Sequence, residues 1–532
     1  MLEDMIARAL SEVNKIKKGG AATLFFHNLA RFDGIILLRH LALHLEQPYT
    51  IKPLVRNSRI YEILIHMKTG NPKKQQKLVL RIRDSCKLLP GSLADLAASF
   101  CPDAGGKGEI DHENVDVHKL GSHREEYLDY LDQDIVLLGL IVQKAQDIYW
   151  QRYKIDIVAD MTISALAMSI FRMEFYDDVN CRIYIPNKNA DTFVREGYYG
   201  GHADLYIPAD DNLLYLYDVN SLYPFVMGSR DMPGGSPVWH SDLSKQKSGM
   251  DLKDMFGFIK AFVITPSKMD RPFLPYRMKD RTLLFPTGKF GGVYFSEELK
   301  YAETLGYKVY PISGFLFKRM DSPFKDFVHD LYQRRLEAKE KGDKAMAFIH
   351  KITMNSLYGR FGISPESTIT KIGSLNEANK AVMEHDDFIE FSRLGVDKFG
   401  MEKYIYTYNE RADDNDEWNP PYNSAVHISA AIAAYARIHM YRFISANDCY
   451  YTDTDSIVVK NPLPDEEVSS TEIGKFKLEM TIDKAIFLAP KAYCAFNRET
   501  NSDIIKQKGA GKAMVDREWF KSMLEDPDLE RT

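Results

Sequence analysis

The chain has 532 residues, of which 45% are hydrophobic, 27% charged and 12% aromatic, and its formal charge is −6. This composition is typical of a globular protein with several domains, and it excludes a disordered or fibrous chain. An acidic total does not exclude a nucleic-acid partner, because a basic groove can lie on an acidic protein.

The cysteines and the apolar runs exclude further classes of protein. The five cysteines form no Cys-x-x-Cys pair, which disfavours a zinc ribbon or a disulfide framework and favours a reducing compartment. No apolar run approaches the ~18 residues of a membrane helix, so we expect no membrane partner. The first 18 residues contain early acids and no signal-peptide core, so we expect an ordinary amphipathic helix there.

The spacing of apolar residues predicts a mixture of helices and strands, and therefore a mixed α/β fold. In chain order, the predicted elements are a helix over residues 1–18, a buried strand with a turn and a helix over 21–38, a long helix over 123–150, a strand over 213–219, two helices over about 323–341 and 344–358, a buried helix over 424–444, and a strand–turn–strand hairpin over 449–459.

Three aspartates lie at the ends of predicted strands. Asp218 follows the apolar run Leu213–Tyr217 and precedes an Asn-Ser pair that is typical of a helix cap. Asp453 and Asp455 lie in the predicted hairpin, where side chains at positions i and i+2 of an extended chain share one face. Two acids so placed repel each other unless a cation lies between them. Each aspartate taken alone is also compatible with an ordinary exposed turn.

A cation, an amide and an aromatic ring share one face of the second predicted helix. Lys351, Asn355 and Tyr358 are spaced i, i+4 and i+7, which suits a triphosphate with a base stacked behind it. Arg335 and Lys339 are spaced i, i+4 on the preceding helix. Each cation alone is compatible with a solvated surface. Together with carboxylates on a sheet, they predict in-line phosphoryl transfer with two divalent ions.

Four segments resemble the motifs of family B DNA polymerases, and they occur in the family's order. Tyr217–Pro224 (YDVNSLYP) resembles motif A, Lys351–Gly359 (KITMNSLYG) motif B, Tyr451–Ser456 (YTDTDS) motif C, and Lys491–Tyr493 the KxY motif. A fifth segment, Tyr198–Gly201, is similar to the YxGG motif of the protein-primed branch, which occurs in bacteriophages and linear mitochondrial plasmids.

The resemblance implies a role for each position by its place in these motifs. The catalytic carboxylates would be Asp218, Asp453 and Asp455, and the metal ligands would be Asp218, Asp455 and the carbonyl of Val219. The contacts to the incoming nucleotide would be Val219, Tyr223, Arg335, Lys339, Lys351, Asn355 and Tyr358. The contacts to DNA would be Tyr198, Gly200, Gly201, Thr454, Ser456, Lys491 and Tyr493. Lys344 competes with Lys339 for the phosphate role.

The first third of the chain resembles the 3′–5′ exonuclease of this branch. The positions that match its motifs are Asn28, Phe32, Asp33, Ser85, Lys107, Tyr130 and Asp134. The family's first exonuclease motif, an Asp-x-Glu, is absent before Asp33. Two of the four expected carboxylates are therefore missing, and we expect proofreading to be absent or very weak.

The resemblance implies a ribonuclease-H-like exonuclease domain joined to the palm and helical fingers of a right-hand polymerase. The expected boundaries are 1–150 for the exonuclease-like domain without its first strand, 151–227 for a linker and the start of the palm, 228–322 for an insertion and palm, 323–360 for the fingers, 361–423 for a second insertion, 424–490 for the palm and 491–532 for a partial thumb. Both ends are expected to be shorter than in the relatives.

The sequence therefore predicts a DNA-directed DNA polymerase, with a catalytically inactive DNA-binding fragment as the alternative. A nuclease that uses only the first domain is a third reading, which the missing Asp-x-Glu disfavours. The implied cofactors are two Mg²⁺ ions, which Mn²⁺ could replace, because oxygen ligands and phosphates suit them. The implied partners are template and primer DNA, dNTPs and a terminal priming protein. The implied location is the mitochondrion, with a viral or plasmid-encoded cytoplasmic protein as the alternative.

Overall fold

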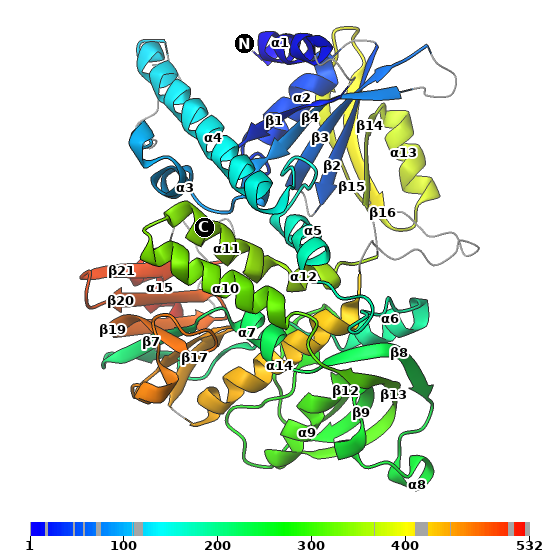
Figure 1. Ribbon diagram of the computed structural model, residues 1–532, viewed down its shortest axis with the longest axis vertical. Coiled ribbons are helices and arrows are strands. Elements are labelled where there is room, and N and C mark those ends of the chain that lie inside the picture. The colour runs from blue at the N-terminus through cyan, green and yellow to red at the C-terminus, as the bar shows by residue number, and fades with distance from the viewer. Residues whose placement is uncertain are drawn as a thin grey trace. The chain divides into compact units, whose positions relative to one another are not determined.

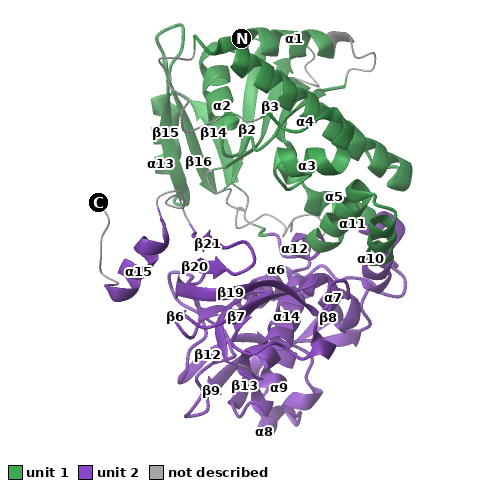
Figure 2. Cartoon of the chain, turned by 90° about the vertical axis from the view of Figure 1, so that its left-hand side faces the viewer, with its two compact units in different colours: residues 1–170, 331–356, 364–419 green, residues 171–330, 357–363, 420–532 purple. Residues whose placement is uncertain are grey.

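The structure is a computed structural model that describes residues 2–15, 20–45, 48–56, 59–70, 76–108, 110, 121–365, 368–409, 424–446, 448–508 and 515–526. Its elements are labelled in Figure 1. The chain divides into two compact units, coloured green and purple in Figure 2. Unit 1 comprises residues 1–170, 331–356 and 364–419, and unit 2 comprises residues 171–330, 357–363 and 420–532.

Unit 1 is built on a four-stranded sheet with the order β1-β4-β3-β2. Strand β1 (Ala22–Phe26) runs parallel to β4 (Gln76–Asp84), and β3 (Arg59–Lys68) runs antiparallel to both β4 and β2 (Tyr49–Arg56). The expected buried strand is confirmed as β1, but its five residues are only half-buried because β1 forms one edge of this sheet among the described strands.

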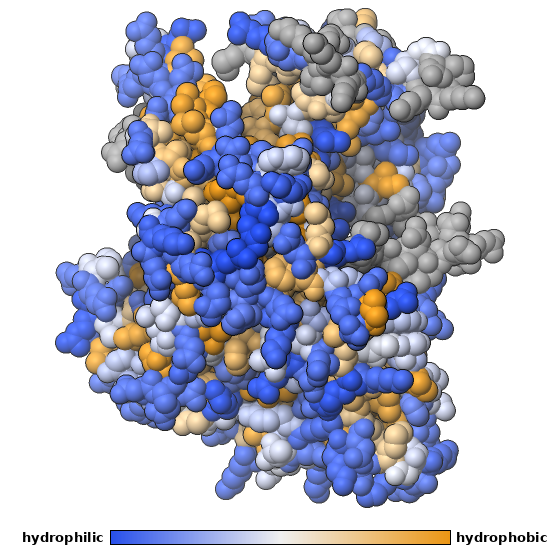
Figure 3. Space-filling view, in the orientation of Figure 1, coloured by the Kyte–Doolittle hydropathy of each residue, from blue (hydrophilic) through white to orange (hydrophobic). Residues whose placement is uncertain are grey.

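The helices of unit 1 include most of those expected. They are α1 (Leu2–Lys15), α2 (Asp33–His44), α3 (Leu93–Phe100), α4 (Arg124–Tyr153) and α11 (Lys344–Ser356). Helices α5 (Ile163–Glu174) and α10 (Lys325–Glu340) cross the boundary between the units. Helix α4 has buried apolar residues on one face, whereas Leu131, Ile135 and Val136 are exposed. The corresponding orange surface over α4 is visible in Figure 3.

A small second sheet completes unit 1. Its order is β14-β16-β15, with the bounds Thr368–Gly373, Glu402–Asn409 and Phe388–Val396, and helix α13 (Leu375–Glu384) packs on β16. Thr368 Oγ1 donates a hydrogen bond to the carbonyl of Val55 on β2, at 3.2 Å, so this sheet adjoins the first one. Residues 410–423 of the expected second insertion lie outside the described residues.

Unit 2 contains a large antiparallel sheet of eight strands. Its order is β21-β20-β19-β7-β18-β17-β5, and β6 also pairs with β19. In chain order the strands are β5 (Ala203–Leu205), β6 (Ala209–Asp210), β7 (Leu214–Val219), β17 (Cys449–Asp453), β18 (Ser456–Val459), β19 (Phe476–Ala489), β20 (Ala492–Asn497) and β21 (Ser502–Lys506). The expected strand and hairpin are confirmed as β7, β17 and β18.

A second sheet of unit 2 has the order β12-β9-β13-β8, and a two-stranded pair, β10 and β11, accompanies it. The bounds of these strands are Met232–His240 for β8, Gly257–Ile264 for β9, Tyr276–Arg277 for β10, Leu283–Leu284 for β11, Lys289–Phe295 for β12 and Lys308–Met320 for β13. The other helices of unit 2 are α6 (Lys188–Glu196), α7 (Leu222–Ser229), α8 (Lys245–Ser248), α9 (Ser296–Thr304), α12 (Tyr358–Phe361), α14 (Val426–Ala446) and α15 (Arg517–Glu525).

Helix α14 is the core of unit 2. It is apolar nearly all round, and it contacts β17 of the large sheet as well as β8 and β12 of the second sheet. A helix that is hydrophobic on every face is expected to be buried in this way. None of the helices in the described part of the chain is long and apolar enough to span a membrane.

The prediction of one helix through residue 358 is wrong. Helix α11 ends at Ser356, and Tyr358 begins the separate turn α12. The N–H of Arg360 bonds the carbonyl of Leu357, a tighter i→i+3 bond, and the carbonyl of Tyr358 instead accepts a hydrogen bond from Ser429 Oγ on α14. Tyr358 therefore lies outside the helix that carries Lys351 and Asn355.

Candidate functional site

The three aspartates singled out by the sequence gather at one place on the large sheet, Asp218 and Asp453 on strands and Asp455 in the turn between β17 and β18. Asp218 on β7 lies opposite Ser456 on β18, and Asp453 at the end of β17 lies opposite the same serine. The N–H of Val219 donates to the carbonyl of Asp455, at 2.8 Å. Backbone pairing thus fixes Asp218 beside the turn that carries the other two carboxylates.

Asp455 lies in the turn of the hairpin, as expected, and the chain at this turn is not extended. Thr454 has a φ of 65°, and the N–H of Asp455 donates to the carbonyl of Asp453, at 2.8 Å. Such a left-handed residue is costly outside glycine and needs support from its surroundings. The N–H of Thr454 supplies part of that support, because it donates to the carbonyl of His202, at 2.8 Å.

The glycines of the YxGG segment allow this close approach. A Cβ at Gly201 would lie 2.6 Å from Thr454 Cγ2. Only a residue without a side chain fits such a contact without displacement. The structure therefore brings the YxGG segment, residues 198–201, directly against the turn that carries Asp453 and Asp455.

The two carboxylates of the turn differ in their electrostatic surroundings. Burial raises the pKa of Asp455, and the nearby charge of Asp453 raises it further. Asp453 is paired with Lys491, whose Nζ lies 2.7 and 2.8 Å from its two carboxylate oxygens. Asp455 is therefore a carboxylate that positive charge would stabilise.

The oxygen donors of this site suit a hard divalent cation. Within the described residues, however, no group of three or more His, Cys, Asp or Glu side chains is close enough together to hold a metal by itself. A site for such an ion would therefore need further oxygen ligands, and a backbone carbonyl and substrate phosphates are suitable donors.

The KxY segment is fastened to motif C. The N–H of Lys491 donates to Tyr451 Oη at 2.8 Å, and the ring of Tyr493 lies 5.3 Å from that of Tyr451. Both predicted residues of this motif therefore lie at the site, with Lys491 bonded to Asp453.

Two aromatic residues from different motifs form a stack beside the carboxylates. The rings of Tyr223 on α7 and Tyr358 on α12 are 4.1 Å apart at 11°. Burial raises the pKa of both hydroxyls, so both are neutral at physiological pH. Tyr198 lies close by, since a Cβ at Gly362 would be 2.7 Å from its ring.

The predicted phosphate-binding residues belong to unit 1. Arg335 and Lys339 lie on α10, Lys351 and Asn355 lie on α11, and Lys344 is the first residue of α11. Burial lowers the pKa of Arg335. Among the described residues, the Oδ1 atom of Asn355 is buried and has no hydrogen-bond partner. Contacts of these residues with a nucleotide stay predictions.

The exonuclease-like residues lie around the end of β1 and on α4. The N–H of Asn28, which has a φ of 67°, donates to Asp84 Oδ1 at 2.9 Å, and Ser85 Oγ donates to the carbonyl of Phe26 at 3.1 Å. Asp33 is exposed at the first position of α2, and the preceding Phe32 is 64% exposed. These residues belong to unit 1.

The carboxylate of Asp134 is paired with a lysine. Its Oδ2 atom lies 3.8 Å from Lys107 Nζ, which also lies over the ring of Tyr130 at 5.5 Å. The hydrogen bond to Tyr130 raises the pKa of Lys107, and Asp134 raises it further, so this lysine remains charged. The structure thus gathers three of the predicted exonuclease-like residues in one cluster.

Sequence reasoning missed a buried ion pair that holds the YxGG segment. Arg437 of α14 is 1% exposed and bonds Glu298 of α9 through two nitrogens, at 2.7 and 2.8 Å. Its Nη1 atom donates to the carbonyls of Tyr199 and Gly200. The position of Arg437 in the middle of the apolar run of residues 424–444 was the available signal, because a buried charge requires partners.

A solved structure shares this fold. The structure of phi29 DNA polymerase complexed with primer-template DNA matches with a TM-score of 0.71, over 98% of this chain and 88% of that chain, at 21% identity. The likeness confirms the expected mixed α/β architecture of a right-hand polymerase.

The family is shown by sequence. The family model for DNA polymerase type B, organellar and viral, matches residues 14–127 and 121–448. The chain therefore belongs to this family, which confirms the expected resemblance.

Proteins from fungi and a phage are similar to the chain. Proteins named "Probable DNA polymerase" from Podospora anserina and Neurospora intermedia are 33% and 29% identical over 89% and 97% of this chain. The chain spans 43% and 56% of their lengths. A "DNA-directed DNA polymerase" of Enterobacteria phage PRD1 is 24% identical over 95% of this chain and 78% of its own length.

Proposed function

We propose that this chain is a DNA-directed DNA polymerase that extends a primer by two-metal nucleotidyl transfer. The observation that carries the proposal is the convergence of Asp218 on β7 with Asp453 and Asp455 at the turn between β17 and β18, tied together by the Val219–Asp455 backbone bond. Carboxylates fixed on rigid backbone are what a pair of divalent ions requires. Membership of the type B family supports the same reaction.

Asp218, Asp455 and the carbonyl of Val219 would hold the ions, with Asp453 beside them. Two Mg²⁺ ions, or Mn²⁺ in their place, would when bound activate the primer hydroxyl and neutralise charge on the triphosphate. The half-buried Asp455 would contribute a charge that water screens poorly, since partial burial is the main cause of its raised pKa. Lys491 would hold the carboxylate of Asp453 in place through its two contacts.

The incoming nucleotide would lie on the Tyr223–Tyr358 stack. The face of Tyr223 would lie under the sugar and leave no room for a 2′-hydroxyl, and Tyr358 would flank the new base pair. The triphosphate would be held by Arg335, Lys339 or Lys344, and Lys351, and Asn355 would contact the base pair. In this proposal α10 and α11 act as fingers, and the eight-stranded sheet acts as the palm.

The DNA would contact the site through two short segments. Tyr198, Gly200 and Gly201 would contact the template, and Lys491 and Tyr493, with Thr454 and Ser456, would steady the primer end. A terminal priming protein is a further partner in this proposal, with residues 228–322 as its contact. The replicon would be a plasmid or virus, and a mitochondrial location can be checked by fractionating cells that carry the gene.

Primer extension tests the proposal directly. We expect the purified chain, with Mg²⁺ and four dNTPs, to extend a primer on a single-stranded template, and the Asp218→Asn, Asp455→Asn double variant to be inactive. Asp178→Asn serves as a control, since Asp178 is exposed in the same unit and lies outside the motifs. A folded parent that binds the primed template without extending it would favour an inactive DNA-binding protein.

A further inference from the structure

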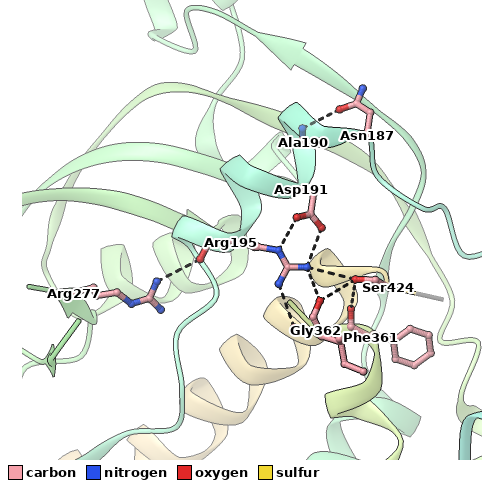
Figure 4. Close-up of polar contacts among 9 residues, drawn as sticks. Asn187, Ala190, Asp191, Arg195, Arg277, Phe361, Gly362 and Ser424 are labelled. Carbon is pink, nitrogen blue, oxygen red and sulfur yellow. Dashed lines mark hydrogen bonds and ion pairs between the residues drawn. The ribbon is translucent and has the colours of Figure 1, made fainter. Parts of the chain in front are cut away.

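An aspartate and an arginine on helix α6 form an ion pair in which the aspartate is buried and the arginine is partly exposed. Asp191 is 1% exposed, and its two carboxylate oxygens accept from Nε and Nη2 of Arg195, at 2.6 and 3.1 Å. Figure 4 shows this pair facing the start of α14 and the segment after motif B. On sequence alone, the i, i+4 spacing suggests only an ordinary helical surface pair.

The two terminal nitrogens of Arg195 also bond two separate stretches of chain. Nη1 donates to the carbonyl of Gly362 at 3.2 Å, and Nη2 donates to the carbonyl of Ile363 at 2.8 Å. Nη2 also lies 3.4 Å from Ser424 Oγ. The chain leaves unit 2 after Ile363 and is again described within it from Ser424. One guanidinium therefore contacts the chain at both ends of residues 364–423.

Both stretches support the aromatic residues of the candidate site. Ser424 Oγ and the N–H of Ala425 donate to the carbonyl of Phe361. Ser429 on α14 donates to the carbonyl of Tyr358. Gly362 packs directly against the ring of Tyr198, which follows Arg195 by three residues. Arg195 therefore stands between the YxGG segment and the turn that carries Tyr358.

We infer that Arg195, oriented by Asp191, is a positioning residue that sets the spacing of Tyr198 and Tyr358 for the incoming nucleotide. The inference rests on the proposed polymerase function. A planar guanidinium offers five donors in a fixed fork, and Arg195 uses this fork to join one carboxylate, two carbonyls and one hydroxyl. A lysine can keep the charge beside Asp191 but cannot reach this set of acceptors. Stability alone is a weak reason for such a pair, because buried ion pairs often add little to it.

The Arg195→Lys variant separates positioning from folding. In this variant Tyr198 and Tyr358 would be held less firmly in place. The KM for dNTP is therefore expected to rise about tenfold while kcat changes little, which corresponds to a loss of about 1.4 kcal/mol in binding free energy. A merely structural role would lower the fraction of active protein, and so the maximal rate, and would leave KM unchanged. Asp191→Asn keeps the carbonyl contacts of Arg195 and is expected to raise KM less.

The matched control is Arg83→Lys in unit 1. Arg83 is also buried, with Nε 2.5 Å from Glu62 Oε1 and Nη1 2.6 Å from the carbonyl of Val158. We expect this variant to lose thermal stability with no change in KM for dNTP.

An Arg195→Lys protein whose KM equals that of an active parent would overturn the inference and leave the proposed function standing. A parent that incorporates no nucleotide would overturn the proposed function and this inference with it. If Arg195→Lys does not fold, Asp191→Asn decides, and an unchanged KM in that variant also overturns the inference.

Discussion

Asp455 of unit 2 and Asp134 of unit 1 are both aspartates that the family resemblance assigns to metal sites, yet their surroundings differ. Asp455 lies in a turn whose backbone is bonded to two neighbouring segments, and burial raises its pKa. Asp134 lies on a helix, and its carboxylate is paired with Lys107 at 3.8 Å. The other exonuclease-like aspartate, Asp33, is exposed at the start of α2.

The difference concerns where positive charge is already supplied. In unit 1 Lys107 accompanies Asp134, whereas in unit 2 Lys491 is paired with Asp453, and Asp455 is half-buried beside the like charge of Asp453. A carboxylate with a raised pKa and oxygen-rich neighbours is a better candidate for a divalent ion than one already paired. We therefore expect chemistry at the first site and little at the second.

The largest expected effect is at Asp455. Asp455→Asn should lower kcat for nucleotide incorporation by about 10²- to 10³-fold, because it removes a buried charge from the proposed metal site. Asp453→Asn should cost less, since Lys491 already neutralises that carboxylate. Steady-state incorporation on a primed template measures both, with Asp178→Asn as control. Equal losses in the two aspartate variants would contradict the distinction drawn between the two carboxylates.

The close packing beneath the turn is tested by Gly201→Ala. The new Cβ would lie 2.6 Å from Thr454, so we expect a destabilisation of about 1–3 kcal/mol from overpacking. Chemical denaturation measures this change. Gly200→Ala is the control, since a Cβ at Gly200 would have its nearest contact at 4.0 Å. Gly235→Ala is a poor control because Gly235 has a φ of 65°, which strains any other residue. Equal stability of the two variants would show that the YxGG segment is not packed as described.

The histidine beneath the same turn should make stability depend on pH. His202 is buried against Phe285, and burial lowers its pKa to about 3. The imidazole of His202 binds a proton more readily in the unfolded chain than in the folded one. The folded state is therefore fully stable, as far as His202 is concerned, above pH 6.5, and its free energy of unfolding decreases as the pH falls below that value. His202 alone should cost about 2 kcal/mol between pH 7.5 and pH 5. His202→Phe should reduce the slope of unfolding free energy against pH over that range, and an unchanged slope would refute the assignment.

The smallest expected effect is at the exonuclease-like site, where we expect no measurable activity. Lys107 already accompanies Asp134, and Asp33 is exposed at the start of α2. A 3′-labelled single strand incubated with Mg²⁺ should remain intact. Metal-dependent degradation that disappears in Asp33→Ala would contradict this expectation and erase the contrast between the two sites.

Local patterns predicted much of the fold, because each element carries its own periodicity. The strand before Asp218, the hairpin around Asp453 and the apolar helix of residues 424–444 are confirmed within a few residues. The break before Tyr358 was not predictable in this way. The carbonyl of Tyr358 accepts a hydrogen bond from Ser429, a residue 71 positions away, and local spacing does not show such a partner.

The candidate site was predicted to a similar extent. Motif spacing identified the carboxylates, the KxY lysine and the two stacked tyrosines, because these residues lie in long uninterrupted motifs. It missed Arg437 and Arg195, which act on backbone carbonyls of distant segments. Every residue has a backbone carbonyl, so residue types in the sequence do not indicate which carbonyl an arginine will bond.

The sequence by itself determined the family, the acids of the site and the order of the elements, since these depend on residue types at short spacing. Only the tertiary structure decided that Asp453 is paired with Lys491 and that partial burial raises the pKa of Asp455, because burial and ion pairing depend on chain segments far apart in sequence. The same holds for Gly201, whose lack of a side chain acquires its meaning only where Thr454 comes within van der Waals distance.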